Sequence, residues 1–278
     1  TLSLTKETIK DTAANIQANI VSIENAIKSS SSIGAYAINA INVSDKGSIT
    51  LTDTALLANI DALKAISSSY KLNVTDISAA DAIALKAPNT NAKLTVAISD
   101  TTANIASNWA KLQTLASSKT LVSMTVTDNA SSMLTMTSAE FKADASALKL
   151  ITSNYKLGVT DVTAADLSKV MAAKNIYSVT IKDSSANVLK NLTPIQAAVG
   201  ASKIQSVTLT DGTNPTFMIS NAYAFVSTLP NLSFASGAKF NIKDTASNII
   251  AHARDDIGDV LKNAGTVTIS DKTSPKLT

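Results

Sequence analysis

The sequence predicts an α/β protein in which short parallel strands and helices alternate as a tandem-repeat solenoid, with extra hairpins in alternate units. Three observations predict this class. A short strand motif recurs along the chain, helical periodicity follows most copies, and the spacings between copies themselves recur. Because one such unit cannot bury its own apolar side chains, neighbouring units have to stack on each other.

The recurring motif is an apolar residue, any residue, a second apolar residue, then Thr, Ser or Lys, and finally Asp. Its period of two is typical of a short strand, so Met124 and Val126 are expected on one face and Thr125 and Thr127 on the other. A weaker copy ends at Asp11. The clear copies end at Asp45, Asp76, Asp100, Asp128, Asp161, Asp183, Asp211, Asp244 and Asp271.

The spacing of these Asp residues indicates a super-repeat of three units. From Asp100 onward the spacings are 28, 33, 22, 28, 33 and 27 residues, and before it they are 34, 31 and 24. We therefore predict one continuous repeat domain over 1–278. Its approximate super-repeats are 11–99, 100–182 and 183–271.

First units continue as a helix directly after the Asp. The segments after Asp11 and Asp100 place apolar residues on one helical face, as in Ile105, Trp109 and Leu112. Trp109 takes the place of Ile20 in this pattern, so we expect it in the core.

Second units insert a turn-rich segment and then another alternating run, such as Ile49–Thr52 or Leu134–Thr137, which predicts a β-hairpin. Thr137 and Glu140 have the spacing of a capping box at the start of the next helix. Third units are compact, and Ser78 with Asp81 or Thr163 with Asp166 fit a similar N-terminal pairing.

Two arrangements of these units fit the pattern. One is an open, leucine-rich-repeat-like solenoid with a strand face and a helix face, and the other is a row of small α/β modules. We favour the solenoid, because the units differ in length in their connections while the strand motif stays the same.

The Asp residues that end the strands are the candidate structural caps. A carboxylate there can accept hydrogen bonds from the free N–H groups of a helix start. Calcium bound along the Asp column is the alternative, but only one carboxylate per turn can be identified and a calcium site needs about six to eight oxygens. Four asparagines recur four residues after a first-unit Asp, and we interpret them as structural: Asn15, Asn104, Asn187 and Asn248.

Several function classes lack support in the sequence. The chain has no cysteine and one histidine, His252, so thiolate metal sites and two-histidine sites are excluded. No phosphate-binding loop, serine elbow or carboxylate pair indicates an enzyme or a cofactor. The net charge of +3 is scattered without a basic, aromatic-rich cluster, and no apolar run is long enough to enter a membrane, so neither nucleic-acid binding nor membrane insertion is expected.

The runs Val-Ser-Met-Thr-Val-Thr-Asp128 and Asp100-Thr-Thr-Ala-Asn-Ile-Ala resemble the Ala/Thr/Asp-rich tandem repeats of very large secreted bacterial surface proteins. Many of those proteins are adhesin-like or type I-secreted. The resemblance extends over nearly the whole chain and implies an extracellular or cell-surface location. It departs from the calcium-binding members, because the Gly-Gly-x-Gly-x-Asp motif is missing.

We therefore expect a structural segment, such as a spacer, a stalk or an S-layer-like lattice element, with an adhesive role as an extension. The alternative is a binding module that uses the exposed strand face. The expected partners are other surface proteins or further copies of this chain, joined through the ends of the array. The strand-like run Leu2-Ser-Leu4 and the strand that ends at Asp271 would form these ends, and the polar tail Lys272–Lys276 is not a covering element.

Overall fold

The computed structural model describes residues 5–33, 36–129, 131–143, 146–211, 214–229, 231–234, 239–253 and 258–271. The predicted strand at Leu2-Ser-Leu4 and the tail after Asp271 lie outside these residues. The chain forms a mixed α/β structure in two compact units, one of residues 1–134 and 143–155 and the other of residues 135–142 and 156–278.

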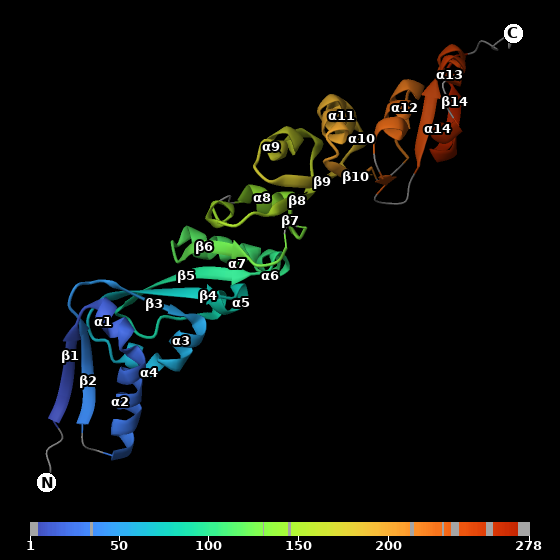
Figure 1. Ribbon diagram of the computed structural model, residues 1–278. Coiled ribbons are helices and arrows are strands. Elements are labelled where there is room, and N and C mark those ends of the chain that lie inside the picture. Colours follow the sequence, from blue (N-terminus) through green and yellow to red (C-terminus); the bar gives the residue numbers. More distant parts are fainter. Residues whose placement is uncertain are drawn as a thin grey trace. The chain divides into compact units, whose positions relative to one another are not determined.

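Unit 1 holds two parallel sheets, with strand orders β1-β2 and β3-β4-β5-β6 (Figure 1). Its strands are β1 (Thr5–Asp11), β2 (Tyr36–Val43), β3 (Ser48–Thr52), β4 (Tyr70–Ile77), β5 (Ala92–Asp100) and β6 (Leu121–Val126). Its helices are α1 (Ala13–Ala18), α2 (Ile20–Ile33), α3 (Asp53–Ala58), α4 (Ile60–Lys64), α5 (Ala79–Ala84), α6 (Thr102–Ser107), α7 (Trp109–Ser117) and the 3-10 turn η1 (Leu148–Leu150).

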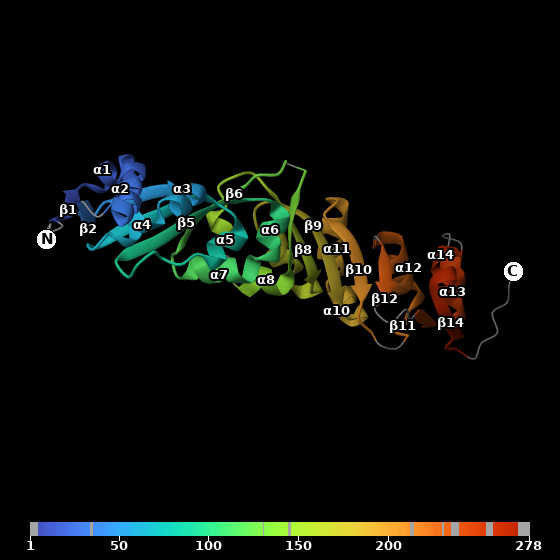
Figure 2. The same cartoon turned by 90° about the horizontal axis from the view of Figure 1, so that it is seen from below.

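Unit 2 continues the same alternation, and β8, β9 and β10 lie side by side in its larger sheet (Figure 2). Its strands are β8 (Lys156–Val162), β9 (Ile176–Asp183), β10 (Ile204–Leu209), β11 (Thr216–Phe217), β12 (Leu232–Phe234), β13 (Phe240–Asp244) and β14 (Ala264–Ile269). Its helices are η2 (Ala164–Asp166), α9 (Leu167–Met171), α10 (Ser185–Lys190), α11 (Leu192–Gly200), α12 (Ile219–Thr228), α13 (Ala246–Ala253) and α14 (Gly258–Asn263). The strand β7 (Met133–Thr137) and the helix α8 (Ser138–Ala143) contain the boundaries between the units.

Parallel pairing aligns the apolar side chains of neighbouring strands in rows. Ile49 is in register with Leu72, and Leu51 with Val74, and all four side chains are buried. Helices such as α3 and α5 pack against this buried face. The period of two leaves polar residues such as Asn73 on the opposite face. The same alternation places Met124 and Val126 inside and Thr125 and Thr127 outside, as the sequence predicts.

The predicted hairpins in the second units are wrong. The strand β2 pairs in parallel with β1, whereas β3 begins the next sheet and pairs in parallel with β4. The chain changes sheet in the same way between β6 and β7 and between β10 and β11. Alternating polarity fits a parallel strand as well as a hairpin arm, and the apolar residues of β3 match those of β4.

The predicted caps Asp76 and Asp161 are also wrong. Both residues have left-handed backbones, with φ of 54° and 55°, and both lie at register shifts just before the last residue of a strand. Their strands continue to the buried residues Ile77 and Val162. Ser78 or Thr163 then precedes the helical turn. Aspartate tolerates this backbone region better than most residues. The two positions therefore require a residue that can adopt the left-handed conformation, and not a helix cap.

We predict that Asp76→Gly will change the free energy of unfolding by less than about 0.5 kcal/mol, because glycine adopts positive φ without strain. Asp76→Val should cost about 2 kcal/mol, because a β-branched side chain clashes in this conformation. Urea denaturation of the two variants and the parent measures both effects. An Asp76→Gly variant as unstable as Asp76→Val would show that the carboxylate itself matters.

Candidate functional site

The carboxylates at the strand ends are the most regular polar feature of the structure. In the first units, however, the N-cap of the helix is the residue that follows the Asp. Thr101 has an extended backbone and its hydroxyl accepts the N–H of Asn104. Asp100 is instead the last residue of β5, in register with Val126. The prediction that Asp100 itself is the N-cap residue is therefore corrected by one position, because its backbone belongs to the sheet.

The Asp100 carboxylate joins three segments of unit 1. Its Oδ1 accepts the N–H of Thr101 at 2.8 Å and the side-chain amide of Asn104 at 2.7 Å. Its Oδ2 accepts the N–H of Ala79, the first residue of α5, at 2.8 Å. The side chain thus stabilises its own loop with one oxygen and the start of the preceding helix with the other.

The same arrangement recurs in unit 2. Asp183 accepts from Ser184 and Asn187 with Oδ1 and from the N–H of Ala164 with Oδ2, at 2.8, 2.7 and 2.9 Å. Asp244 accepts from Thr245, Asn248 and Ile219 in the same way, at 2.8, 2.7 and 3.0 Å. Asp11 makes the two Oδ1 contacts, to Thr12 and Asn15.

The second-unit carboxylates also accept the first N–H of a helix that comes earlier in the chain. Asp45 accepts the N–H of Ala13, the first residue of α1, at 3.1 Å. Asp128 accepts both the N–H and, at 2.7 Å, the hydroxyl of Thr102. Asp211 and Asp271 accept the first N–H groups of α10 and α13, from Ser185 and Ala246.

These contacts connect residues that are 19 to 32 positions apart. Each of these carboxylates therefore joins the end of one strand to the start of the helix that follows an earlier strand. We call these bonds the carboxylate staples. The members with this contact are Asp45, Asp100, Asp128, Asp183, Asp211, Asp244 and Asp271.

The helix α8 begins without a carboxylate staple among the described hydrogen bonds. Its first residue is Ser138, whose buried hydroxyl has no hydrogen-bond partner among the described residues. In the equivalent place, the Thr102 hydroxyl is bound by Asp128. Asp161, the motif Asp that comes after α8 in the chain, lies in the left-handed bulge and faces Lys182 at 3.9 Å.

The predicted structural asparagines donate to carboxylates and not to loop backbone groups. Asn15, Asn104, Asn187 and Asn248 each lie 2.7 Å from the Oδ1 of the preceding motif Asp. They lie in the first turn of a helix, and their amides add a donor that the backbone cannot supply there.

A second set of asparagines was missed by sequence reasoning. The helical segments after Asp11, Asp100 and Asp183 are each split in two, and an Asn stands at the break with φ near −110°. Its amide donates to the carbonyl four residues earlier, at 2.9 Å in each case: Asn19, Asn108 and Asn191. Their recurrence four residues after the first asparagine set is the signal that would have found them.

Hydrogen bonds control the pKa values of three staple carboxylates. The pKa of Asp45 lies below its ordinary value of 3.8, because the N–H groups of Gly47 and Ala13 stabilise the charged form. Burial raises the pKa of Asp128 and Asp244, but donors such as the Thr102 hydroxyl and the Asn248 amide outweigh burial and lower both.

Two of the predicted capping pairs and the core residue Trp109 agree with expectation, whereas Thr163 only donates its hydroxyl to Asp166 and accepts no cap N–H. The Thr137 hydroxyl accepts the N–H of Glu140, whose carboxylate accepts the N–H of Thr137 in return, at 3.2 and 2.8 Å. Ser78 and Asp81 pair similarly. Trp109 is fully buried, and His252 lies near the end of α13 with its ring stacked on Tyr223.

The staple oxygens are directed at N–H, O–H and amide donors. Within the described ranges, no group of three or more His, Asp or Glu side chains is placed to hold a metal ion. None of the described helices has the length and apolar character needed to cross a membrane. The chemistry of the site is therefore the stabilisation of helix starts.

No protein-family model, no curated protein and no solved structure matches this chain.

We predict that Asp100→Asn will lower the free energy of unfolding by about 1.5–3 kcal/mol, because the variant loses hydrogen bonds to a charged acceptor. Asp76→Asn removes the same charge from a motif Asp without a staple, so it should be nearly neutral. Urea unfolding monitored by circular dichroism compares them. Equal losses in both variants would mean that net charge and not the staple is responsible.

We predict that stability will fall as the pH drops below about 4. The folded-state pKa values of Asp45, Asp128 and Asp244 lie below the ordinary 3.8, so their contribution is complete above that pH and is lost as these carboxylates protonate. Urea midpoints between pH 6 and pH 2.5 measure the slope. Asp128→Asn should flatten it, and a parent whose midpoint stays constant to pH 2.5 would contradict the assignment.

Proposed function

We propose that this chain is a solenoid-like structural repeat segment, a spacer, stalk or lattice element of a bacterial protein exported to the cell surface. The observation that carries the proposal is the recurrence of the carboxylate staples. If such contacts form only between neighbouring repeats, further repeats can be added to an array with the same contacts. The stability of the array is then a sum of nearest-neighbour terms. The proposal assigns no catalytic role and no cofactor to the chain.

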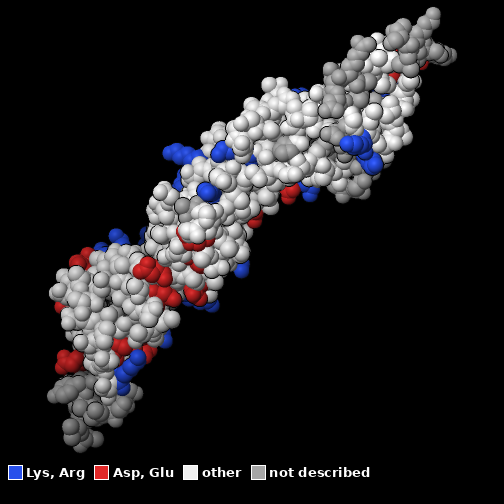
Figure 3. Space-filling view, turned by 45° about the vertical axis from the view of Figure 1, so that its right-hand side comes forward, with Lys and Arg blue, Asp and Glu red and all other residues white. Residues whose placement is uncertain are grey.

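The composition of the surface supports this role. Only 16% of the residues are charged, and large areas between the charged side chains carry none (Figure 3). The outer strand faces are joined by lateral hydrogen bonds between small polar side chains, as in Asn73 with Thr50 and Thr208 with Ser233. Such side chains stiffen a sheet and leave few anchors for a large apolar partner.

The cell-surface location rests on the resemblance of the Asp128 and Asp100 runs to the repeats of secreted bacterial surface proteins. An adhesive role extends the same proposal. A binding module is the second candidate, and the lysine-lined hollows on the strand face of unit 1 favour it.

Association with further copies or other surface proteins through the end strands also belongs to the proposal. The edge strand β14 leaves Val267 and Ile269 45% and 50% exposed. The strand β6 has the equivalent place in the sequence, since both strands follow one that ends in a first-unit Asp. Its apolar residues Met124 and Val126 are buried. An uncovered apolar strand at a sheet edge favours the addition of another strand.

We predict that a variant with residues 100–182 duplicated in tandem will fold completely. Nearest-neighbour stacking gives the added super-repeat the contacts that the original one has, so its melting temperature should equal or exceed that of the parent. Limited proteolysis and far-ultraviolet circular dichroism per residue measure the outcome. Rapid cleavage confined to the added segment would contradict the solenoid arrangement, and a scrambled segment of equal length is the control.

A further inference from the structure

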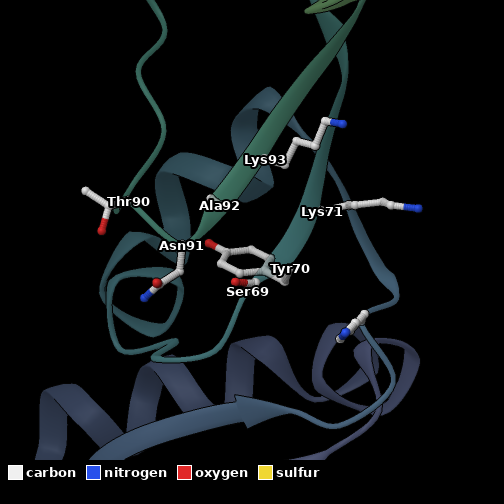
Figure 4. Close-up of a pocket in the computed structure, with 8 residues that line it drawn as sticks. Ser69, Tyr70, Lys71, Thr90, Asn91, Ala92 and Lys93 are labelled. Carbon is white, nitrogen blue, oxygen red and sulfur yellow. The ribbon is translucent and has the colours of Figure 1, made fainter.

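The strand face of unit 1 carries lysines in direct register. Lys71 of β4 and Lys93 of β5 are aligned partners in a parallel sheet, where neighbouring strands are about 4.8 Å apart. Their side chains extend to the same side of the sheet (Figure 4). Like charges placed opposite each other destabilise a sheet, so this pair costs stability unless an anion lies between or beside them.

Two hollows flank this pair. The first, of about 310 Å³, is lined by Lys46, Tyr70, Asn91 and the lysine pair, together with Ser69, Thr90 and Ala92. The second, of about 400 Å³, is lined by the lysine pair with Lys119, Asn73, Thr95, Ser118, Thr120 and Leu94. Neither lining contains an Asp or a Glu, so the potential in both is positive.

The four lysines of the hollows form no ion pair among the described residues. All four are exposed, and the ion pairs found among the described residues involve other lysines. Lys119 has φ of 61°, a strained backbone for a lysine, at the end of α7 where glycine is usual. Lys119 is also one of the residues that line the larger hollow.

The other lining groups indicate the class of anion. The second hollow is also lined by residues with hydroxyl and amide groups, Asn73, Thr95, Ser118 and Thr120, which suit a ligand rich in hydroxyls. The one aromatic side chain in the two linings, Tyr70, is buried at 3% exposure and offers no ring face for a nucleobase.

We propose that the hollows beside Lys71 and Lys93 bind an acidic polysaccharide, a sulfated or carboxylated sugar chain lying across β4, β5 and the start of β6. The ammonium groups neutralise its anionic groups, and the hydroxyl and amide groups bind its sugar hydroxyls. This binding goes beyond the spacer role and does not depend on it, so its failure leaves that role untouched.

The test is retention of the full chain on immobilised dextran sulfate, with uncharged dextran as reference. Lys71→Gln with Lys93→Gln should weaken affinity at least tenfold. Lys111→Gln with Lys149→Gln removes the same charge from exposed lysines of unit 1 outside both hollows, and should change affinity less than twofold. Equal losses in both pairs, or no retention of the parent at low salt, would overturn the proposal.

Two further measurements test the class of ligand and the repulsion between Lys71 and Lys93. A thymidine oligonucleotide or polyglutamate that binds the parent as tightly as dextran sulfate would overturn the assignment to a polysaccharide. Lys93→Glu places opposite charges in register, so it should raise the melting temperature while abolishing retention. A lower melting temperature, or full retention in this variant, would contradict the argument.

Discussion

The hydrogen bond from the first N–H of a helix to a carboxylate at the end of a later strand is the contact on which the architecture depends. The helices of the first and third units begin with segments of about six residues, too short to be stable in isolation, and their first N–H groups have no partner within the helix. A carboxylate such as that of Asp100 satisfies such a group and also fixes the next strand relative to it. One side chain thus connects the end of a strand to the start of a helix that comes earlier in the chain.

Where the chain changes from one sheet to the next, polar groups satisfy the edge of the sheet that ends. Where β2 and β6 leave a free edge, a short segment adds a single bridge, from Ile66 to Ile41 and from Ile151 to Met124. A serine hydroxyl two residues later accepts a backbone N–H of the strand. Ser68 accepts the N–H of Val43, and Ser153 accepts the N–H of Val126. One bridge and one hydroxyl thus satisfy backbone groups near the carboxyl ends of β2 and β6.

Parallel strands, buried faces and capping boxes could be predicted from residue patterns, because each depends on local periodicity or spacing. Alternation cannot distinguish a parallel strand from a hairpin arm, since both have a period of two, and the hairpins were therefore wrong. The bulges at Asp76 and Asp161 could have been predicted from the residue that follows each Asp. Each is followed by an apolar residue that continues the strand, whereas Asp100 and Asp183 are followed by Thr or Ser. The partners of the staples lie 19 to 32 residues away in the chain, so no local pattern could identify them.

The two kinds of charge in unit 1 differ in how far the fold uses them. The Asp100 carboxylate is directed at protein donors and the residue is 8% exposed, so little of its charge is available to a partner. Lys71 and Lys93 lie near the opposite, amino-terminal ends of their strands, exposed and without a carboxylate in the lining of either hollow. Lys71 and Lys93 thus place aligned positive charge at one point of the strand face, although the net charge of the chain is only +3.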